Sequence, residues 1–317
     1  MFRPGEEPKR KVSINCLITD GGMGDLLCHL VTVSYLVKKV KHVDPYIWVP
    51  DYLLEFAKNV LPKEAKIYNY TTAIKKYNNK MIGISTRWAG QHTAMRCHPI
   101  DYSNHVLLDT DLPIEQKNYL KFNSEEIDLS KFNLPENYVI MSVGSTAKTK
   151  ELSPELLNQL ADYIIEKGYT PVFIGKSEMN PGSGPKMLAK LAEVDYTKGI
   201  DLTNKTTLTE AAAIISKAKA FVGMEGGMTH LAGFTDVKIV AGYGFVDPTR
   251  MMPIRNNLQG YNVFPLVPES TLACRYCQTN MALLYDHDFK NCYYDDYTCI
   301  KQLTFDKWKV QIDKCLL

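Results

Sequence analysis

The sequence predicts an α/β protein with two doubly wound parallel sheets, one in each half of the chain. Short apolar, β-branched runs alternate with longer segments whose apolar residues recur at helical spacing, which is typical of parallel strands joined by crossover helices. Midway, residues 125–137 are polar and contain Pro135, as expected of a linker between domains. A chain of 317 residues is long enough to form two hydrophobic cores.

The first half carries four expected strands and three expected helices. The strands are residues 13–19, 46–49, 66–68 and 80–84, and the helices are residues 25–41, 52–60 and 71–77. Residues 90–123 are polar and rich in histidine, and they show no pattern that assigns them to either class.

The alternation is clearer in the second half. Ser153 is placed to cap a helix that has Pro154 in its first turn and ends at Gly168. The expected strands are residues 138–143, 170–174, 220–222 and 238–241, and the expected helices are residues 154–167, 208–217 and 228–234. Ligands of doubly wound sheets bind at the carboxyl ends of the strands, and we expect them here in a cleft between the domains.

Composition and charge indicate which partners and which location to expect for the protein. The formal net charge of +2 requires no polyanionic partner, and no apolar stretch is long enough to span a membrane. Residues 1–11 are polar and lack the apolar core of a signal peptide. We therefore expect a cytoplasmic protein without integral membrane association.

The first candidate for chemistry is the run from Asp20 to Leu27, which contains three glycines and follows an apolar strand. Such a loop lets backbone N–H groups at the start of a helix face a ligand. The spacing differs from the dinucleotide fingerprint, because Asp25 and Leu27 stand where glycine is required. Asp25 is either an N-cap of the helix or a catalytic carboxylate.

A second candidate follows the expected strand that ends at Val222. Gly226 and Gly227 form a turn, and the helix that begins near Met228 has free N–H groups that suit a phosphate. Glu225 is placed to accept hydrogen bonds from sugar hydroxyls, and His230 lies one turn into the helix. The alternative is a tight turn followed by a histidine of the core.

A third candidate follows the first strand of the second half. Ser145 and Lys150 lie in a loop of small hydroxyl residues and lysines, which suits a diphosphate because lysine is a flexible point charge. A polar loop before a helix would have the same composition.

In this order, these clusters resemble the ADP-heptose:lipopolysaccharide heptosyltransferases and their relatives in glycosyltransferase family 9. The resemblance runs from about residue 14 to residue 303. The matching segments are Gly24-Asp25, Gly144-Ser145 with Lys150 before Ser153-Pro154-Glu155, Gly175 with Glu178, Asp201-Leu202-Thr203 with Thr207-Leu208, and Glu225-Gly226 with His230-Leu231-Ala232.

The resemblance implies a GT-B fold of two Rossmann-like domains. The first, residues 1–130, would bind the acceptor, and the second, residues 131–303, would bind a nucleoside-diphosphate sugar. The C-terminal helix, residues 304–317, would pack back on the first domain.

The resemblance also implies roles for single residues. Asp25 would be the general base and Lys150 the partner of the diphosphate. The other residues of the donor site would be Ser145, Glu178, Thr206, Glu225, Gly226, Gly227 and His230. The family usually has aspartate where this chain has Glu225, and the longer side chain would suit a donor sugar of a different shape.

The function implied is an inverting transfer of a sugar to a hydroxyl acceptor, most simply on a bacterial surface glycan such as the lipopolysaccharide core. Lys150 and the helix N-terminus at Met228 would stabilise the departing diphosphate, so that no cofactor and no catalytic metal is required. Two alternatives are a transferase that acts on a hydroxymethylated base of DNA, with nucleic acid as partner, and a non-catalytic nucleotide-sugar binding protein.

Four of the eight cysteines have the spacing C-x2-C-x14-C-x6-C, at Cys274, Cys277, Cys292 and Cys299. The opening pair has the spacing of zinc ligands, so structural zinc, disulfides and reduced thiols are all open. Two D-x-D matches, at residues 109–111 and 286–288, are expected by chance in a chain with 35 acidic residues, and we assign them no metal.

Overall fold

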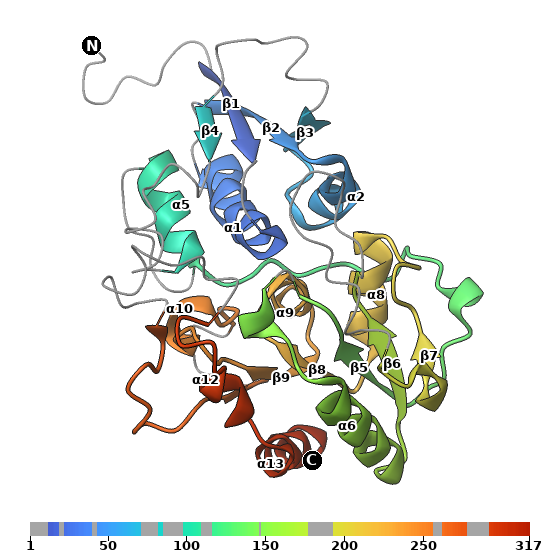
Figure 1. The fold of residues 1–317 in the computed structure, drawn as a ribbon. Helices are drawn as coiled ribbons and strands as arrows, with labels where there is room; N and C mark the ends of the chain where they lie inside the picture. Colours follow the sequence, from blue (N-terminus) through green and yellow to red (C-terminus); the bar gives the residue numbers. More distant parts are fainter. Residues whose placement is uncertain are drawn as a thin grey trace. The chain divides into compact units, whose positions relative to one another are not determined.

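The computed structural model describes residues 12–18, 22–39, 43–70, 82–84, 98–108, 116–145, 147–176, 193–255, 262–277 and 292–317 (Figure 1). The chain divides into two compact units, Met1–Asn123 and Ser124–Leu317. This division lies a few residues before the boundary that the sequence predicts, and the polar linker residues belong to the start of unit 2. None of the described helices has the length and apolarity that a membrane span needs.

Unit 1 is a parallel sheet with helices that follow its strands. The described elements are β1 (Val12–Ile18), α1 (Met23–Lys39), β2 (Val43–Val49), α2 (Asp51–Val60), β3 (Lys66–Asn69), β4 (Ile82–Ile84) and α5 (Pro99–Leu108). The strand order is β3-β2-β1-β4, with every pair parallel. The helix expected at residues 71–77 lies outside the described residues.

The helix α5 forms where the sequence shows no pattern. Pro99 opens it, and the ring nitrogen Nδ1 of His98 accepts a hydrogen bond from Ile100 N–H at 3.2 Å. Its buried face carries polar side chains that pair with α1: Thr32 donates to Asn104 Oδ1 at 2.7 Å. The helix is therefore held by contacts with α1 that apolar periodicity does not reveal.

His29 of α1 is fully buried in this interface. Ser103 donates its hydroxyl proton to the carbonyl of Pro99, so the hydrogen bond between His29 Nδ1 and Ser103 Oγ must be donated by the histidine. Within the described residues, His29 Nε2 has no hydrogen-bond partner. Burial lowers the pKa of His29 from 6.5 to about 3, because a charged ring would lose its hydration without gaining a counter-ion.

Unit 2 is a six-stranded parallel sheet of order β10-β9-β8-β5-β6-β7. Its strands are β5 (Tyr138–Ser142), β6 (Thr170–Ile174), β7 (Ile200–Asp201), β8 (Ala220–Met224), β9 (Lys238–Gly242) and β10 (Val263–Leu266). Its helices are α6 (Pro154–Glu166), α8 (Leu208–Lys217), α9 (Gly227–Gly233), α10 (Pro248–Met251), α12 (Thr298–Lys301) and α13 (Phe305–Leu316), with the 3₁₀ turns η2 (Ser130–Phe132), η3 (Lys148–Lys150) and η4 (Tyr196–Lys198). Figure 1 shows α6 and α13 on one face of this sheet and α8 and α9 on the other.

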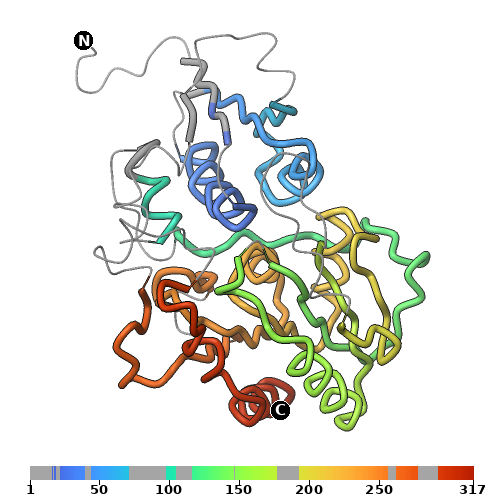
Figure 2. The backbone as a smooth tube through the Cα atoms, viewed as in Figure 1, coloured from blue at the N-terminus to red at the C-terminus, as the bar shows by residue number. Residues whose placement is uncertain are grey.

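The C-terminal helix α13 packs on the sheet of unit 2, where its buried face lies. The packing on the first domain that the resemblance implies stays a prediction. Trp308, Ile312 and Cys315 form an apolar stripe that joins the core under β8, β9 and β10. Asp313 accepts a hydrogen bond from the Tyr163 hydroxyl at 2.6 Å and pairs with Lys167 at 2.8 Å, which ties α13 to α6. The backbone trace shows the C-terminal helix beside this part of unit 2 (Figure 2). The apolar stripe completes the face of the sheet that α6 leaves open, and this burial decides where the helix packs.

The burial of His29 predicts that acid weakens unit 1. The pKa of His29 is lower in the folded chain than in the unfolded chain. Between about pH 3 and 6.5, the unfolded chain therefore binds a proton on this histidine and the folded chain does not. The contribution of His29 to the stability of the native state is lost as the pH falls through that range. The free energy of unfolding should fall by about 2 kcal/mol from this group at pH 5. Urea unfolding at pH 5, 6 and 7 measures it. In His29→Asn the difference between pH 7 and pH 5 should shrink by this amount, and an unchanged difference would exclude His29 as its source.

Candidate functional site

Three neighbouring strands of unit 2 deliver polar residues to the same edge of the sheet. The strands β9, β8 and β5 are adjacent and parallel, so the loops that follow them leave from one edge. After β5 comes the turn η3 with Lys150, after β8 comes Glu225, and after β9 come Tyr243 and Phe245. This edge therefore gathers two of the three clusters that the sequence analysis singles out.

Two glycines allow the strands to approach closely there. A Cβ atom on Gly223 would lie 2.7 Å from Cβ of Ser142, so a larger residue in β8 would push β5 away. Gly144, just after β5, has a φ of 78°, which residues with a side chain rarely adopt. The chain can thus turn out of β5 and bring η3 over the end of β8.

Glu225 is the centre of the site. Its side chain is only 4% exposed, and its Oε2 lies 2.7 Å from Nζ of Lys150, whose side chain is 24% exposed. The Oε1 atom lies 3.8 Å from Nε2 of His230, which is equally buried. One carboxylate is therefore held between a lysine from the loop after β5 and a histidine from α9.

The charge of Glu225 depends on these neighbours. Burial acts to raise the pKa of the carboxyl, but the ammonium of Lys150 and the hydrogen bond and charge of His230 outweigh it and lower the pKa to about 2. Glu225 is therefore ionised at every pH at which the protein would work. Next to it, burial and then the negative charge of Glu225 raise the pKa of Tyr243 well above its ordinary value.

The helix α9 begins one residue earlier than expected and spans seven residues, Gly227–Gly233. Gly226 is extended at its start, and Thr229 donates a hydrogen bond to the carbonyl of Met224 at 2.7 Å. The backbone N–H of His230 donates to the carbonyl of Gly226 at 3.1 Å, which closes the first turn of the helix. Gly226 and Gly227 are both half-buried at the edge of the site.

Other residues of the predicted donor site are more dispersed. Ser145 is half-buried, and its hydroxyl accepts a hydrogen bond from Ala147 N–H at 3.2 Å, so it shapes the loop. Thr206 lies between β7 and α8, at the far edge of the sheet. Glu178 lies outside the described residues, as do both D-x-D matches and residues 19–21 of the opening glycine loop.

Asp25 lies in the first turn of α1 and is half-buried. Its Oδ2 accepts a hydrogen bond from Gly22 N–H at 2.9 Å, so it caps the helix from its third position rather than as the N-cap. A capping carboxylate has a fixed direction at the start of the helix, and this role does not remove its ability to accept a proton.

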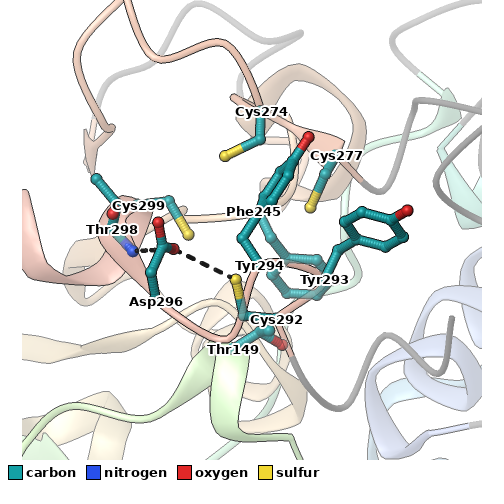
Figure 3. Close-up of a pocket in the computed structure, with 10 residues that line it drawn as sticks. All are labelled: Thr149, Phe245, Cys274, Cys277, Cys292, Tyr293, Tyr294, Asp296, Thr298 and Cys299. Atoms are coloured by element: carbon teal, nitrogen blue, oxygen red, sulfur yellow. Dashed lines mark hydrogen bonds between the residues drawn. The ribbon is translucent and has the colours of Figure 1, made fainter.

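The four cysteines of the C-terminal region line one pocket, together with Thr149, Phe245, Tyr293, Tyr294, Asp296 and Thr298 (Figure 3). All are free thiols, as are the other three cysteines in the described part of the chain. Burial and then the nearby Cys277, Cys292 and Cys274 raise the pKa of Cys299 to about 12. In the described ranges, no three Cys, His, Asp or Glu side chains stand close enough to hold a metal ion as they are.

Sequence reasoning missed Tyr243 and Phe245. The signal that could have found these two residues is their position directly after β9, a buried strand that lies beside β8, the strand before Glu225. Both are buried, and the ring of Phe245 lies 5.4 Å from Nζ of Lys150. They form the third wall of the site. The tyrosines Tyr293 and Tyr294 lie beside the cysteines, and this accounts for the aromatic run there.

Solved structures with the same fold were found over nearly the whole chain. A glycosyltransferase of family 9 from Veillonella parvula is 15% identical, with 98% of each chain covered and a TM-score of 0.70. The iron-containing dodecameric glycosyltransferase TibC of enterotoxigenic Escherichia coli is 15% identical, with 99% of this chain and 81% of that chain covered and a TM-score of 0.69. The E. coli heptosyltransferase WaaC with ADP-2-deoxy-2-fluoro heptose is 13% identical, with 96% and 99% covered and a TM-score of 0.55.

These structures are GT-B glycosyltransferases, and the two parallel sheets of this chain have the same fold. No curated protein matches the chain. The family model for glycosyltransferase family 9 (heptosyltransferase) matches residues 89–277. This match spans more than half of the sequence, and the chain therefore belongs to glycosyltransferase family 9, the heptosyltransferase family.

Proposed function

We propose that this protein is an inverting glycosyltransferase that moves a sugar from a nucleoside-diphosphate sugar to a hydroxyl group of a bacterial surface glycan, such as the lipopolysaccharide core. The observation that carries the proposal is the group of Lys150, Glu225 and His230 at the carboxyl edge of the sheet in unit 2. Family membership supports it, and the ADP-linked sugar in the WaaC structure supports an ADP-linked donor. The seven cysteines in the described ranges are all free thiols, which fits a reducing compartment, so we place the enzyme in the cytoplasm.

Lys150 is the residue that we assign to the diphosphate. Its ammonium is the most exposed charge of the group, and the ion pair with Glu225 fixes its position. Glu225, Gly226, Gly227 and His230 would then line the donor sugar and phosphates, with Ser145 shaping the loop. Thr206 and Glu178 are assigned to the nucleoside: β7 lies three strands from β8, about 14 Å at ordinary strand spacing. That distance suits a nucleotide that extends along the edge of the sheet.

Asp25 is the residue that we assign to the acceptor. In the transfer, the acceptor oxygen forms a bond to the anomeric carbon of the donor while the bond from that carbon to the diphosphate oxygen breaks. Asp25 takes the proton of the acceptor hydroxyl, and the nucleoside diphosphate leaves with the bonding electrons. Lys150 stabilises the charge on the leaving group, so we propose that the step needs no added divalent cation.

The four cysteines are proposed to hold a structural metal ion of the class that thiolates bind, zinc or iron. They fit such an ion because four sulfur atoms from two short segments converge on one pocket, the first pair has the C-x2-C spacing, and none is consumed in a disulfide. The name of TibC, an iron-containing relative in fold, supports iron as well as zinc. The ion would fasten residues 292–299 to residues 274–277, and the thiols would have to move closer together to bind it.

The assignment of Lys150 predicts that Lys150→Ala weakens nucleoside-diphosphate binding by about 1.5–3 kcal/mol, the range of a hydrogen bond to a charged group. Calorimetry with ADP, UDP and GDP measures it. Lys148→Ala is the matched control, because Lys148 is an exposed lysine of the same turn. Equal affinity of the wild type and the Lys150 variant would refute the donor site.

The assignment of Asp25 predicts that Asp25→Asn lowers turnover by about 10²–10⁴-fold. The amide can still accept the hydrogen bond from Gly22, so helix α1 and the thermal stability should be almost unchanged. It cannot accept the proton of the acceptor hydroxyl. Rates are measured with nucleotide-sugar donors and glycan acceptors by mass spectrometry. If the variant keeps a near wild-type rate, Asp25 is a helix cap only.

The metal proposal predicts about one zinc or iron ion per purified chain, measured by elemental analysis. Cys277→Ser and Cys292→Ser should each lose the metal and lower the melting temperature. Cys315→Ala is the control for metal content, since Cys315 is a thiol on the buried face of α13 and does not line the pocket. A metal content near zero in protein purified without chelator would contradict the proposal.

A further inference from the structure

The cysteine pocket and the Lys150 group share a wall. Thr149, which directly precedes Lys150, is buried and lines the pocket, and so does Phe245 (Figure 3). The same Phe245 ring has the Lys150 ammonium 5.4 Å from its centroid. The two sites are thus separated by single side chains of unit 2.

The contact of Phe245 with Lys150 is of the cation–π type. An ammonium within about 6 Å of a ring centroid is attracted to the face of the ring, and the attraction grows where water is excluded. Phe245 is 4% exposed, so water is excluded from the ring side of the pair, while the side chain of Lys150 is 24% exposed. The carboxylate of Glu225 and the ring of Phe245 therefore hold the same ammonium from two directions.

The loop that carries Phe245 packs against α12, the helix that carries Cys299. A Cβ atom on Gly244 would lie 2.4 Å from Cδ1 of Ile300 and 3.4 Å from Sγ of Cys299, so α12 packs against the backbone at this point. The preceding residue, Tyr243, feels the charge of Glu225. A shift of α12 would therefore move the segment Tyr243–Phe245, whose last residue holds its ring beside the Lys150 ammonium.

We propose that Phe245 is a positioning residue that couples the state of the four-cysteine pocket to Lys150, and so sets the affinity for the nucleoside diphosphate. The proposal rests on the proposed function of Lys150. When the four cysteine side chains are held close together, α12 stays packed against Gly244 and the ring of Phe245 keeps the Lys150 ammonium in place. When they are not, the ring loses its support and the lysine loses one of its two holding contacts.

The test is the affinity for ADP, measured by calorimetry on the full chain. Phe245→Leu should bind ADP about three- to tenfold more weakly, in line with the loss of one cation–π contact. In the transfer reaction, KM for the donor should rise while kcat changes little. Phe264→Leu is the control for the same change of side chain, because Phe264 of β10 is half-buried against the core of unit 2 and lies outside the pocket.

A double-mutant cycle with Cys299→Ser tests the coupling itself. In the wild-type background, Cys299→Ser should weaken ADP binding by about the same factor as Phe245→Leu, and in the Phe245→Leu background it should add little. Wild-type affinity in Phe245→Leu, or an undiminished effect of Cys299→Ser in that background, overturns the proposal. Unchanged ADP affinity in Lys150→Ala overturns the proposed function instead.

A chemical version of the test needs no variant at Phe245. Blocking the thiols with methyl methanethiosulfonate should weaken ADP binding to the wild type by the same factor, and it should have little effect on Lys150→Ala. The proposal fails if blocking leaves the wild-type affinity unchanged, or if it weakens both proteins equally. This version decides the question should Phe245→Leu fail to fold.

Discussion

The site of unit 2 depends on one ion pair, between the buried carboxylate of Glu225 and the ammonium of Lys150. A carboxylate with 4% of its side chain exposed would take up a proton if it stood alone, since burial disfavours its charge. Lys150 at 2.7 Å, with His230 on the other oxygen, reverses that preference. Removing one partner of such a pair leaves a buried charge uncompensated, which costs far more than an exposed pair contributes. The loops after β5 and β8 are therefore tied to each other by charge.

Local signals in the sequence predicted the elements well where the stabilising contacts are themselves local. Ser153 accepts a hydrogen bond from Leu156 N–H at 3.2 Å, and Gly168 has a φ of 83°, so both ends of α6 are formed by residues within a few positions. The helix α5 was missed because its buried polar residues pair with α1, far away in the sequence. The helix α13 was predicted, but its contacts with α6 and with the sheet of unit 2 were not, because an apolar stripe shows which face is buried and not what covers it.

In the candidate site, too, local signals in the sequence were readable and contacts between distant segments were not. Lys150, Glu225 and His230 follow strands and glycines, so each could be singled out from the sequence. Their mutual contact could not, because it follows from the order of strands in the sheet, in which β8 lies beside β5. Phe245 and Tyr243 carry no motif at all, and only the position of β9 beside β8 brings them to the site. The cysteine spacing predicted that four thiols belong together, but it did not predict their proximity to Lys150.

An ion pair that neutralises Lys150 has to be reconciled with the diphosphate binding that we propose for this residue. The geometry resolves this, because an ammonium has three N–H groups and the ion pair brings one carboxylate oxygen, Glu225 Oε2, to it at 2.7 Å. The face of the ammonium toward Phe245 is held without using a hydrogen bond. Lys150 can therefore keep its contact with Glu225 and donate to phosphate oxygens with the protons that remain. The buried carboxylate thus orients the lysine, and a lysine whose position is already fixed loses less side-chain entropy when the ligand binds.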